Sequence, residues 1–181
     1  MKSKLIVLAL LAVLLFVSCN SESNPDWFKE SLSATDGADW GDPNRDSVYF
    51  DITGSGTISP RTDVVLPADL LIPLEVDGIA VQRVTGCEES TVRNLRIPGG
   101  VRVSAGAFFS CSFLENVVLY GGVVSVGENA FLGCGALERV EVYCSYSAVS
   151  PGAFSESCTA DFVYNGVTYE GYADFRALSN E

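Results

Sequence analysis

Hydrophobic residues recur at a fixed interval along the second half of the chain. The dipeptide Ala-Phe occurs at 107–108, 130–131 and 153–154, and the interval is 23 residues both times. Between the last two of these dipeptides, Val140 and Val142 alternate with polar residues, which predicts a short strand with one buried face. A fixed interval of this length is typical of proteins that stack one structural unit on the next.

Two consecutive units, residues 98–120 and 121–143, are closely similar and share ten identical positions. A third unit at 144–166 is degenerate, as expected for a terminal repeat that closes a stack. A partial unit lies upstream at 79–97. The repeats therefore occupy one continuous part of the chain.

Each unit is predicted to combine a tight turn with a strand. A turn around Ala130, Phe131 and Cys134 is expected to direct these three side chains into the interior. One unit cannot bury its own core, so stacking is expected to place Phe131 between Phe108 and Phe154. Each such burial stabilises the fold by about 1.5–3 kcal/mol.

The repeats resemble the BspA-like leucine-rich repeats of bacterial surface proteins. The consensus of that family, Ile-Pro-x-x-Val-x-x-Ile-Gly-x-x-Ala-Phe-x-x-Cys-x-x-Leu-x-x-Val, is matched at residues 95–117 and again at 124–140. The resemblance covers residues 48–166, about two thirds of the chain. It implies an α/β solenoid, built as a short stack of 23-residue leucine-rich repeats with one parallel β-sheet face and a β-rich N-terminal cap.

The first 19 residues have the pattern of an export signal. Lys2 and Lys4 precede an unbroken apolar run at 5–17, which is too short to span a bilayer as a helix. The run ends in Phe-Val-Ser before Cys19, which resembles the lipobox of bacterial lipoproteins and implies that Cys19 is lipidated. The alternative is ordinary secretion, in which Cys19 has no special role.

The chain is expected to contain five segments and two short helices, the helices at 24–34 and 169–178. The segments are a lipoprotein signal peptide (1–18), the lipidated cysteine with a polar and acidic tether (19–47), the N-terminal β cap (48–78), the leucine-rich repeats (79–166) and a C-terminal cap (167–181).

Composition restricts the chemistry that the protein can perform. The chain has 181 residues, no histidine and a net charge of −12, and removal of residues 1–18 would leave 23 acidic and nine basic residues. A net charge of −14 argues against nucleic acid, which binds clustered Lys and Arg. The lack of histidine excludes Ser-His-Asp and Cys-His catalysis and zinc sites built on histidine.

Four cysteines recur at intervals close to the repeat length: Cys87, Cys111, Cys134 and Cys158. We interpret them as a ladder of buried thiols that act as small hydrophobic side chains. Disulfides are the alternative, since an exported protein can form them, and the redox state of these residues is left open. Cys144 lies outside the ladder and is predicted to be exposed.

The acidic residues suggest neither a metal site nor a glycosidase. Those at 36–51 match no EF-hand loop. Glu115 and Glu138 are equivalent positions in successive repeats and therefore lie on one face, whereas glycoside hydrolysis needs carboxylates that oppose each other. No metal and no cofactor are expected.

Outward positions of the predicted strands form a candidate partner-binding face. If Val117, Val140 and Val163 point inward, their neighbours point outward. Tyr120 and Tyr143 are then expected to stack, either as part of a binding surface or only to stabilise the sheet. The candidate residues are Asn116, Val118, Tyr120, Arg139, Glu141, Tyr143, Phe162 and Tyr164.

Three functions remain open at this point. The first is a non-enzymatic interaction protein anchored at the bacterial envelope through Cys19, in the outer membrane or at the cell surface; the family resemblance implies adhesion to host proteins or to other bacteria. The second is a structural envelope lipoprotein that docks within a complex of its own cell. The third, an enzyme of unrecognised type, has no candidate catalytic residues in the sequence.

Overall fold

A computed structural model describes residues 44–178 of the chain. The predicted signal peptide, the lipidated Cys19, most of the predicted tether and the helix expected at 24–34 lie outside these residues.

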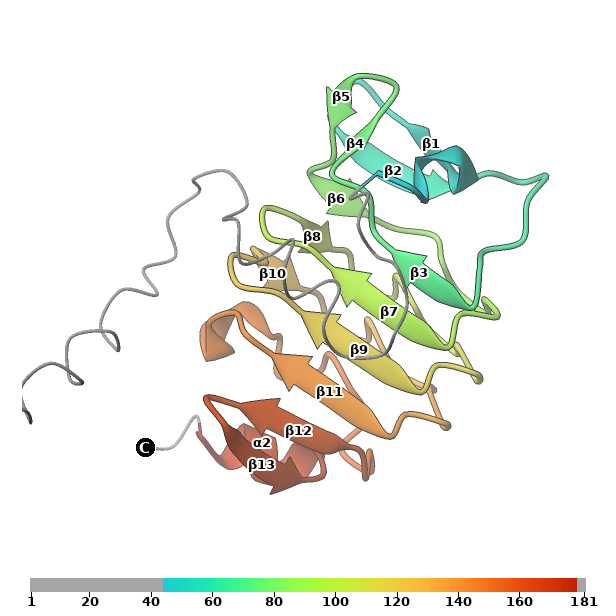
Figure 1. Ribbon diagram of the computed structural model, residues 1–181. Coiled ribbons are helices and arrows are strands. Elements are labelled where there is room, and N and C mark those ends of the chain that lie inside the picture. Colours follow the sequence, from blue (N-terminus) through green and yellow to red (C-terminus); the bar gives the residue numbers. More distant parts are fainter. Residues whose placement is uncertain (1–43, 179–181) are drawn as a thin grey trace, which may run out of the picture.

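The described chain winds into a stack of coils with a parallel sheet on each of two sides (Figure 1). Sheet B has the strand order β13-β12-β11-β9-β7-β3, in which all neighbours are parallel except β12 and β13. Its strands are β3 (Asp69–Leu71), β7 (Asn94–Ile97), β9 (Asn116–Leu119), β11 (Arg139–Val142), β12 (Asp161–Tyr164) and β13 (Val167–Glu170).

Sheet A forms the second side of the stack and has the order β1-β2-β6-β8-β10. Only β1 and β2 are antiparallel. Its strands are β1 (Phe50–Ile52), β2 (Thr57–Pro60), β6 (Arg83–Val84), β8 (Arg102–Val103) and β10 (Ser125–Val126).

The remaining elements are short. A hairpin of β4 (Glu75–Val76) and β5 (Ile79–Ala80) lies near the N-terminal end of the stack (Figure 1). The helical elements are η1 (Ser47–Tyr49), η2 (Tyr146–Ala148) and α2 (Tyr172–Ala177). The parallel sheets and the stacked repeats confirm the predicted solenoid.

Turns that contain the Ala-Phe dipeptides connect the two sheets and stack on one another. The backbone amide of Phe108 donates a hydrogen bond to the Ala130 carbonyl over 2.9 Å, and Phe131 does the same to Ala153 over 2.8 Å. The ring centroids of Phe108 and Phe131 lie 5.5 Å apart at an interplanar angle of 7°, and those of Phe131 and Phe154 lie 4.8 Å apart at 15°. The predicted column of phenylalanines is confirmed.

One glycine is required by the close approach of two turns. A Cβ atom on Gly127 would lie 2.5 Å from the backbone nitrogen of Ala105 and 2.8 Å from its Cα atom. Both of these atoms belong to the backbone, so neither can swing away. The glycine of the repeat consensus therefore permits the spacing between these two coils.

The third repeat is one residue shorter than expected, and this corrects three predicted positions: Phe162 and Tyr164, which were predicted to point outward, and Val163, which was predicted to point inward. Val117 pairs with Val140 at an interval of 23, but Val140 pairs with Phe162 at an interval of 22. Because side chains alternate along a strand, this shift exchanges the two faces of β12. Phe162 is fully buried in the core and Tyr164 also packs against the core, whereas Val163 faces outward.

Aromatic residues close the C-terminal end of the core. Phe162 contacts Phe154 edge to face at a centroid distance of 5.0 Å, and it also packs against Tyr172 and Phe175 of α2, which contact each other. A helix covers the last coil, as predicted, but it begins at Tyr172. Tyr169 belongs instead to β13.

Candidate interaction surface

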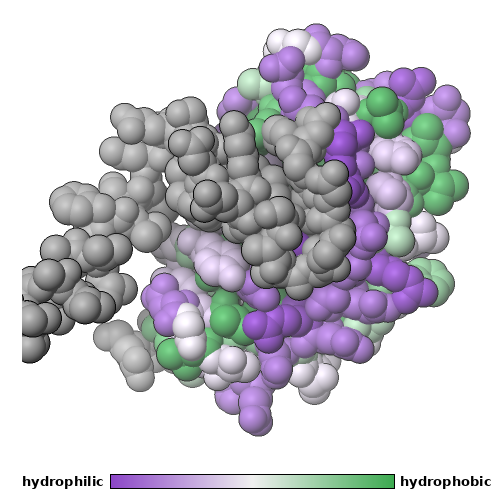
Figure 2. All heavy atoms as spheres, viewed as in Figure 1, coloured by the Kyte–Doolittle hydropathy of each residue, from purple (hydrophilic) through white to green (hydrophobic). Residues whose placement is uncertain are grey.

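The outer face of sheet B is the surface formed by the side chains that point away from the core. In β9 and β11 these are Asn116, Val118, Arg139 and Glu141, and Tyr143 follows directly after β11. All five are exposed or half-buried, as predicted. Hydrophilic residues gather on the part of this face that is shown in colour in Figure 2.

Three of these side chains hold one another in place. Arg139 Nε donates a hydrogen bond to Glu141 Oε1 over 2.8 Å, and the hydroxyl of Tyr143 donates to Glu141 Oε2 over 2.7 Å. Glu141 thus uses both carboxylate oxygens to orient an exposed cation and an exposed ring. We call Arg139, Glu141 and Tyr143 the surface triad.

The triad perturbs the ionisation of its own members. Burial and the hydrogen bond to Glu141 raise the pKa of Tyr143 to about 12. Partial burial acts to raise the pKa of Glu141, but the hydrogen bonds from Arg139 and Tyr143 outweigh it, and the pKa lies below its usual value. Both groups therefore keep their neutral-pH charge state over a wide pH range.

Tyr120 stacks on Tyr143, but it is not the exposed residue that was predicted. The ring centroids lie 6.4 Å apart at an interplanar angle of 19°, and only 2% of Tyr120 is exposed. Its hydroxyl also accepts a hydrogen bond from Arg96 Nη1 over 2.7 Å. Tyr120 lies outside the hydrophobic core cluster, and we assign it a role in supporting Tyr143.

A row of polar residues lies at the start of the strands, and the sequence analysis named only two of its members, Asn116 and Arg139. Asn116 Nδ2 donates to Asn94 Oδ1 over 2.8 Å, and Asn94 Nδ2 donates to Asp69 Oδ1 over 2.6 Å. The row continues in register through Arg139 and Asp161. Its signal in the sequence is a polar residue directly before the buried positions of each strand.

Two predicted members of the face, Phe162 and Tyr164, do not belong to it. Both lie on the inner side of β12, where Phe162 aligns with Val140 and Tyr164 aligns with Val142. The structure therefore brings together Asn116, Val118 and the surface triad, with Tyr120 behind them.

The cysteine ladder lies on the turn side of the stack. Cys111 Sγ donates a hydrogen bond to the Cys87 carbonyl over 3.2 Å, and Cys134 Sγ donates to the Phe108 carbonyl over 3.3 Å. Cys87, Cys111 and Cys134 are buried, while Cys158 is half-buried. Burial raises the pKa of the Cys87 and Cys158 thiols, so both are protonated at neutral pH.

The prediction that Cys144 is exposed is wrong. Cys144 is buried in the core cluster. It continues the inward series of Val140 and Val142 beyond the end of β11, since alternate residues of an extended chain share one face.

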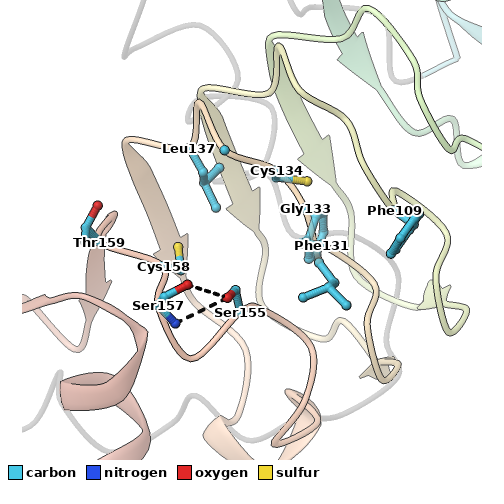
Figure 3. Close-up of a pocket in the computed structure, with 11 residues that line it drawn as sticks. Phe109, Phe131, Gly133, Cys134, Leu137, Ser155, Ser157, Cys158 and Thr159 are labelled. Carbon is cyan, nitrogen blue, oxygen red and sulfur yellow. Dashed lines mark hydrogen bonds between the residues drawn. The ribbon is translucent and has the colours of Figure 1, made fainter.

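An open cavity of about 350 Å³ lies beside the last two repeats, on the turn side (Figure 3). Phe131, Leu137 and Cys158 contribute to its wall, and the hydroxyls of Ser155 and Ser157 hydrogen-bond to each other at its rim. Among residues 44–178, no three Cys, Asp or Glu side chains come close enough to hold a metal ion. No helix in the same range has the length and apolar character to cross a membrane.

Comparison with protein families assigns the repeats. The model of the BspA type leucine rich repeat region matches residues 84–176 in six copies. No curated protein and no solved structure matches the chain. Repeats of this kind commonly bind proteins, and the family is associated with bacterial surface proteins. On the strength of its repeats, its parallel sheets and this match, the chain belongs to the BspA-type leucine-rich repeat family.

Proposed function

We propose that the protein is a surface-anchored, non-enzymatic lipoprotein that binds other proteins through the outer face of sheet B. The observation that supports this most directly is the surface triad, which presents an Arg and a Tyr on a rigid parallel sheet. Arg and Tyr are among the residues enriched at the energetic centres of protein interfaces.

The geometry of the face favours a macromolecular partner. A sheet face of a solenoid is extended and has no deep enclosure, whereas small-molecule sites usually bury most of their ligand. The chain also contains no histidine to serve as a general base. These features support binding and offer no assembled catalytic group.

The internal hydrogen bonds of the triad reduce the entropic cost of binding. Arg139 and Tyr143 are each held by Glu141, and Tyr143 also stacks on the buried ring of Tyr120. Immobilising a flexible side chain at an interface typically costs about 0.5–1.5 kcal/mol. Side chains that are already ordered lose less rotamer freedom when a partner binds, so this cost is smaller. Preorganisation of this kind supports the triad as the centre of the site.

The sequence supports an anchored position in the bacterial envelope. Cys19 would carry the lipid, and residues 19–47 would connect it to the repeats. A mature charge of −14 offers no basic patch for anionic lipids, so the lipid itself would hold the protein at the outer membrane or at the cell surface. The proposed partners are host matrix proteins or surface proteins of other bacteria.

Adhesion of intact cells tests the proposal. Cells that express the full chain are expected to bind an immobilised extracellular-matrix extract. The Arg139→Ala/Tyr143→Ala variant should reduce the binding at least tenfold, which corresponds to a loss of about 1.4 kcal/mol or more.

The matched control is Val124→Ala, because Val124 is similarly exposed, at 42% against 52% for Tyr143, but lies next to sheet A. It should bind as the unsubstituted chain does. Equal binding by the double variant would remove the triad from the site. Protection of the protein from protease added to intact cells would contradict surface adhesion and would support docking within a complex of the same cell.

A further inference from the structure

The two edge strands of sheet B differ in how their outward backbone groups are satisfied. At β3, Arg45 Nη2 donates a hydrogen bond to the Asp69 carbonyl over 2.6 Å. The amide of Leu71 donates to Asp46 Oδ2 over 2.7 Å, and Asp46 is buried. Side chains therefore occupy the hydrogen-bonding positions that another strand would need at this edge.

At the opposite edge, the backbone of Thr168 points away from the sheet. Asn165 and Gly166 form the two-residue turn between β12 and β13, with φ values of 50° and 79°. In such a hairpin the two residues next to the turn form a hydrogen-bonded pair. Beyond them, pairs without backbone hydrogen bonds alternate with hydrogen-bonded pairs. The Gly171 amide donates a hydrogen bond to the Ala160 carbonyl over 3.1 Å, which agrees with this alternation.

The amide and carbonyl of Thr168 therefore face outward. Among the backbone hydrogen bonds outside the regular ladders of residues 44–178, none involves Thr168, and its side chain is exposed. Figure 1 shows β13 as the last strand at the C-terminal end of the sheet. Thr168 thus offers one donor and one acceptor in the geometry that a further strand requires.

The sequence of β13 lacks most of the features that usually protect an edge, and its charged side chain, Glu170, lies at the end of the strand. Proteins block open edges with Lys, Pro, bulges or covering segments. The stretch Val167–Glu170 contains no Lys and no Pro, and Val, Thr and Tyr all favour strands. Val167 is 51% exposed although it is apolar. Among residues 44–178 no segment pairs with the outer side of β13, whereas side chains block the β3 edge.

We propose that β13 pairs with β13 of a second copy of this chain, antiparallel, around a two-fold axis at Thr168. In this register Thr168 lies opposite Thr168 of the second copy and exchanges two backbone hydrogen bonds with it. The two sheets then join into one continuous sheet, and the contact is isologous, as in most homodimers.

The strand is complementary to itself in this register. Val167 lies opposite Tyr169 of the second copy, on the same face, and the pair occurs twice. Cross-strand pairs of an aromatic and a β-branched residue stabilise sheets, as do Thr–Thr pairs. Glu170 lies opposite Gly166 of the second copy, which places the two Glu170 side chains about 13 Å apart along the strands. That separation exceeds the screening length of about 8 Å at physiological salt, so their repulsion is weak.

Disulfide trapping tests the register on the full chain in detergent. Paired Thr168 residues would have Cα atoms about 5.5 Å apart, within the range of about 4.4–6.8 Å that a disulfide needs. Thr168→Cys is therefore expected to form a reducible dimer at least ten times faster than Glu170→Cys on mild oxidation. Glu170 is the matched control, because it lies on the same face of the same strand. The unsubstituted chain measures the background from native cysteines.

Sedimentation of the same material tests the pairing without a cross-link. Thr168→Pro removes the outward amide but no hydrogen bond to β12, so its circular dichroism spectrum and melting temperature should stay unchanged. It should sediment as a monomer at concentrations where the parent chain and Thr168→Val sediment as dimers. A monomeric parent chain, a dimeric Thr168→Pro variant or equal trapping at positions 168 and 170 would overturn the proposal.

Discussion

At the scale of single residues, the phenylalanine column joins successive coils inside the core. Phe131 lies between two stacked rings and is almost completely buried. Phe131→Ala is expected to lower the free energy of unfolding by about 3–5 kcal/mol, because it leaves a cavity between two coils. Phe109→Ala should change it by less than about 0.5 kcal/mol, since Phe109 is 41% exposed. Urea unfolding measures both values, and an equal decrease in the free energy of unfolding for the two variants would contradict the stacked core.

The surface triad makes a prediction about pH. The raised pKa of Tyr143 means that its contribution to stability is complete below about pH 10, the ordinary value for tyrosine, and is lost as the pH rises through about 12. Glu141, whose pKa is lowered, contributes above its ordinary value of about 4.3, and this contribution is lost as the pH falls through the folded-state pKa.

Ultraviolet titration of the phenols measures this effect. Glu141→Gln is expected to lower the pKa of Tyr143 toward 10, because a neutral amide replaces the carboxylate that accepts its hydrogen bond. Tyr143→Phe identifies the transition among the seven tyrosines of the chain. An unchanged titration in Glu141→Gln would show that this hydrogen bond is absent in solution.

At the scale of elements, the turns limit how closely the coils can stack. Gly127→Ala would force a Cβ atom to within 2.5 Å of the Ala105 nitrogen, so it should destabilise the fold by about 1–3 kcal/mol. Gly135→Ala is the control, because no atom lies within 4 Å of the position of its Cβ. Thermal unfolding of both variants makes the comparison, and equal melting temperatures would mean that the two turns are farther apart than described.

The regularity of the repeat determined which elements could be predicted from the sequence. The interval of 23 residues correctly predicted which side chains of β9 and β11 face outward, including Arg139 and Glu141. It failed in β12, because a single missing residue exchanges the two faces of a strand and turned Phe162 inward. The dipeptide Asn165-Gly166 is a known signal for a hairpin turn, but the hairpin of β12 and β13 was not among the predicted elements.

The burial of individual side chains was harder to predict than their direction. Strand alternation placed Tyr120 on the outer side, but neighbours such as Arg96 and Tyr143 decide how much of its ring remains exposed. Cys144 was predicted to be exposed because it lies outside the cysteine ladder, yet it extends the inward row of β11. Such contacts between distant parts of the chain have no local signature in the sequence.

At the scale of the whole molecule, the solenoid has two different ends and two different sides. Side chains block the sheet at β3, whereas among residues 44–178 no strand pairs with the outer side of β13. The thiols of the cysteine ladder lie on the turn side and the surface triad lies on the outer face of sheet B. If two copies pair through β13, their outer faces belong to one continuous sheet, and a partner with repeated epitopes would bind with increased avidity.

The central claim is that the outer face of sheet B contacts another protein. A photo-crosslinking amino acid, introduced into the protein and irradiated on living cells, tests this claim. The residue is introduced at Tyr143 in the full chain and, as the control, at the similarly exposed Val124 beside sheet A. Irradiation is expected to attach a second protein at position 143 and none at position 124. Equal adducts at both positions, or none at position 143, would contradict the account.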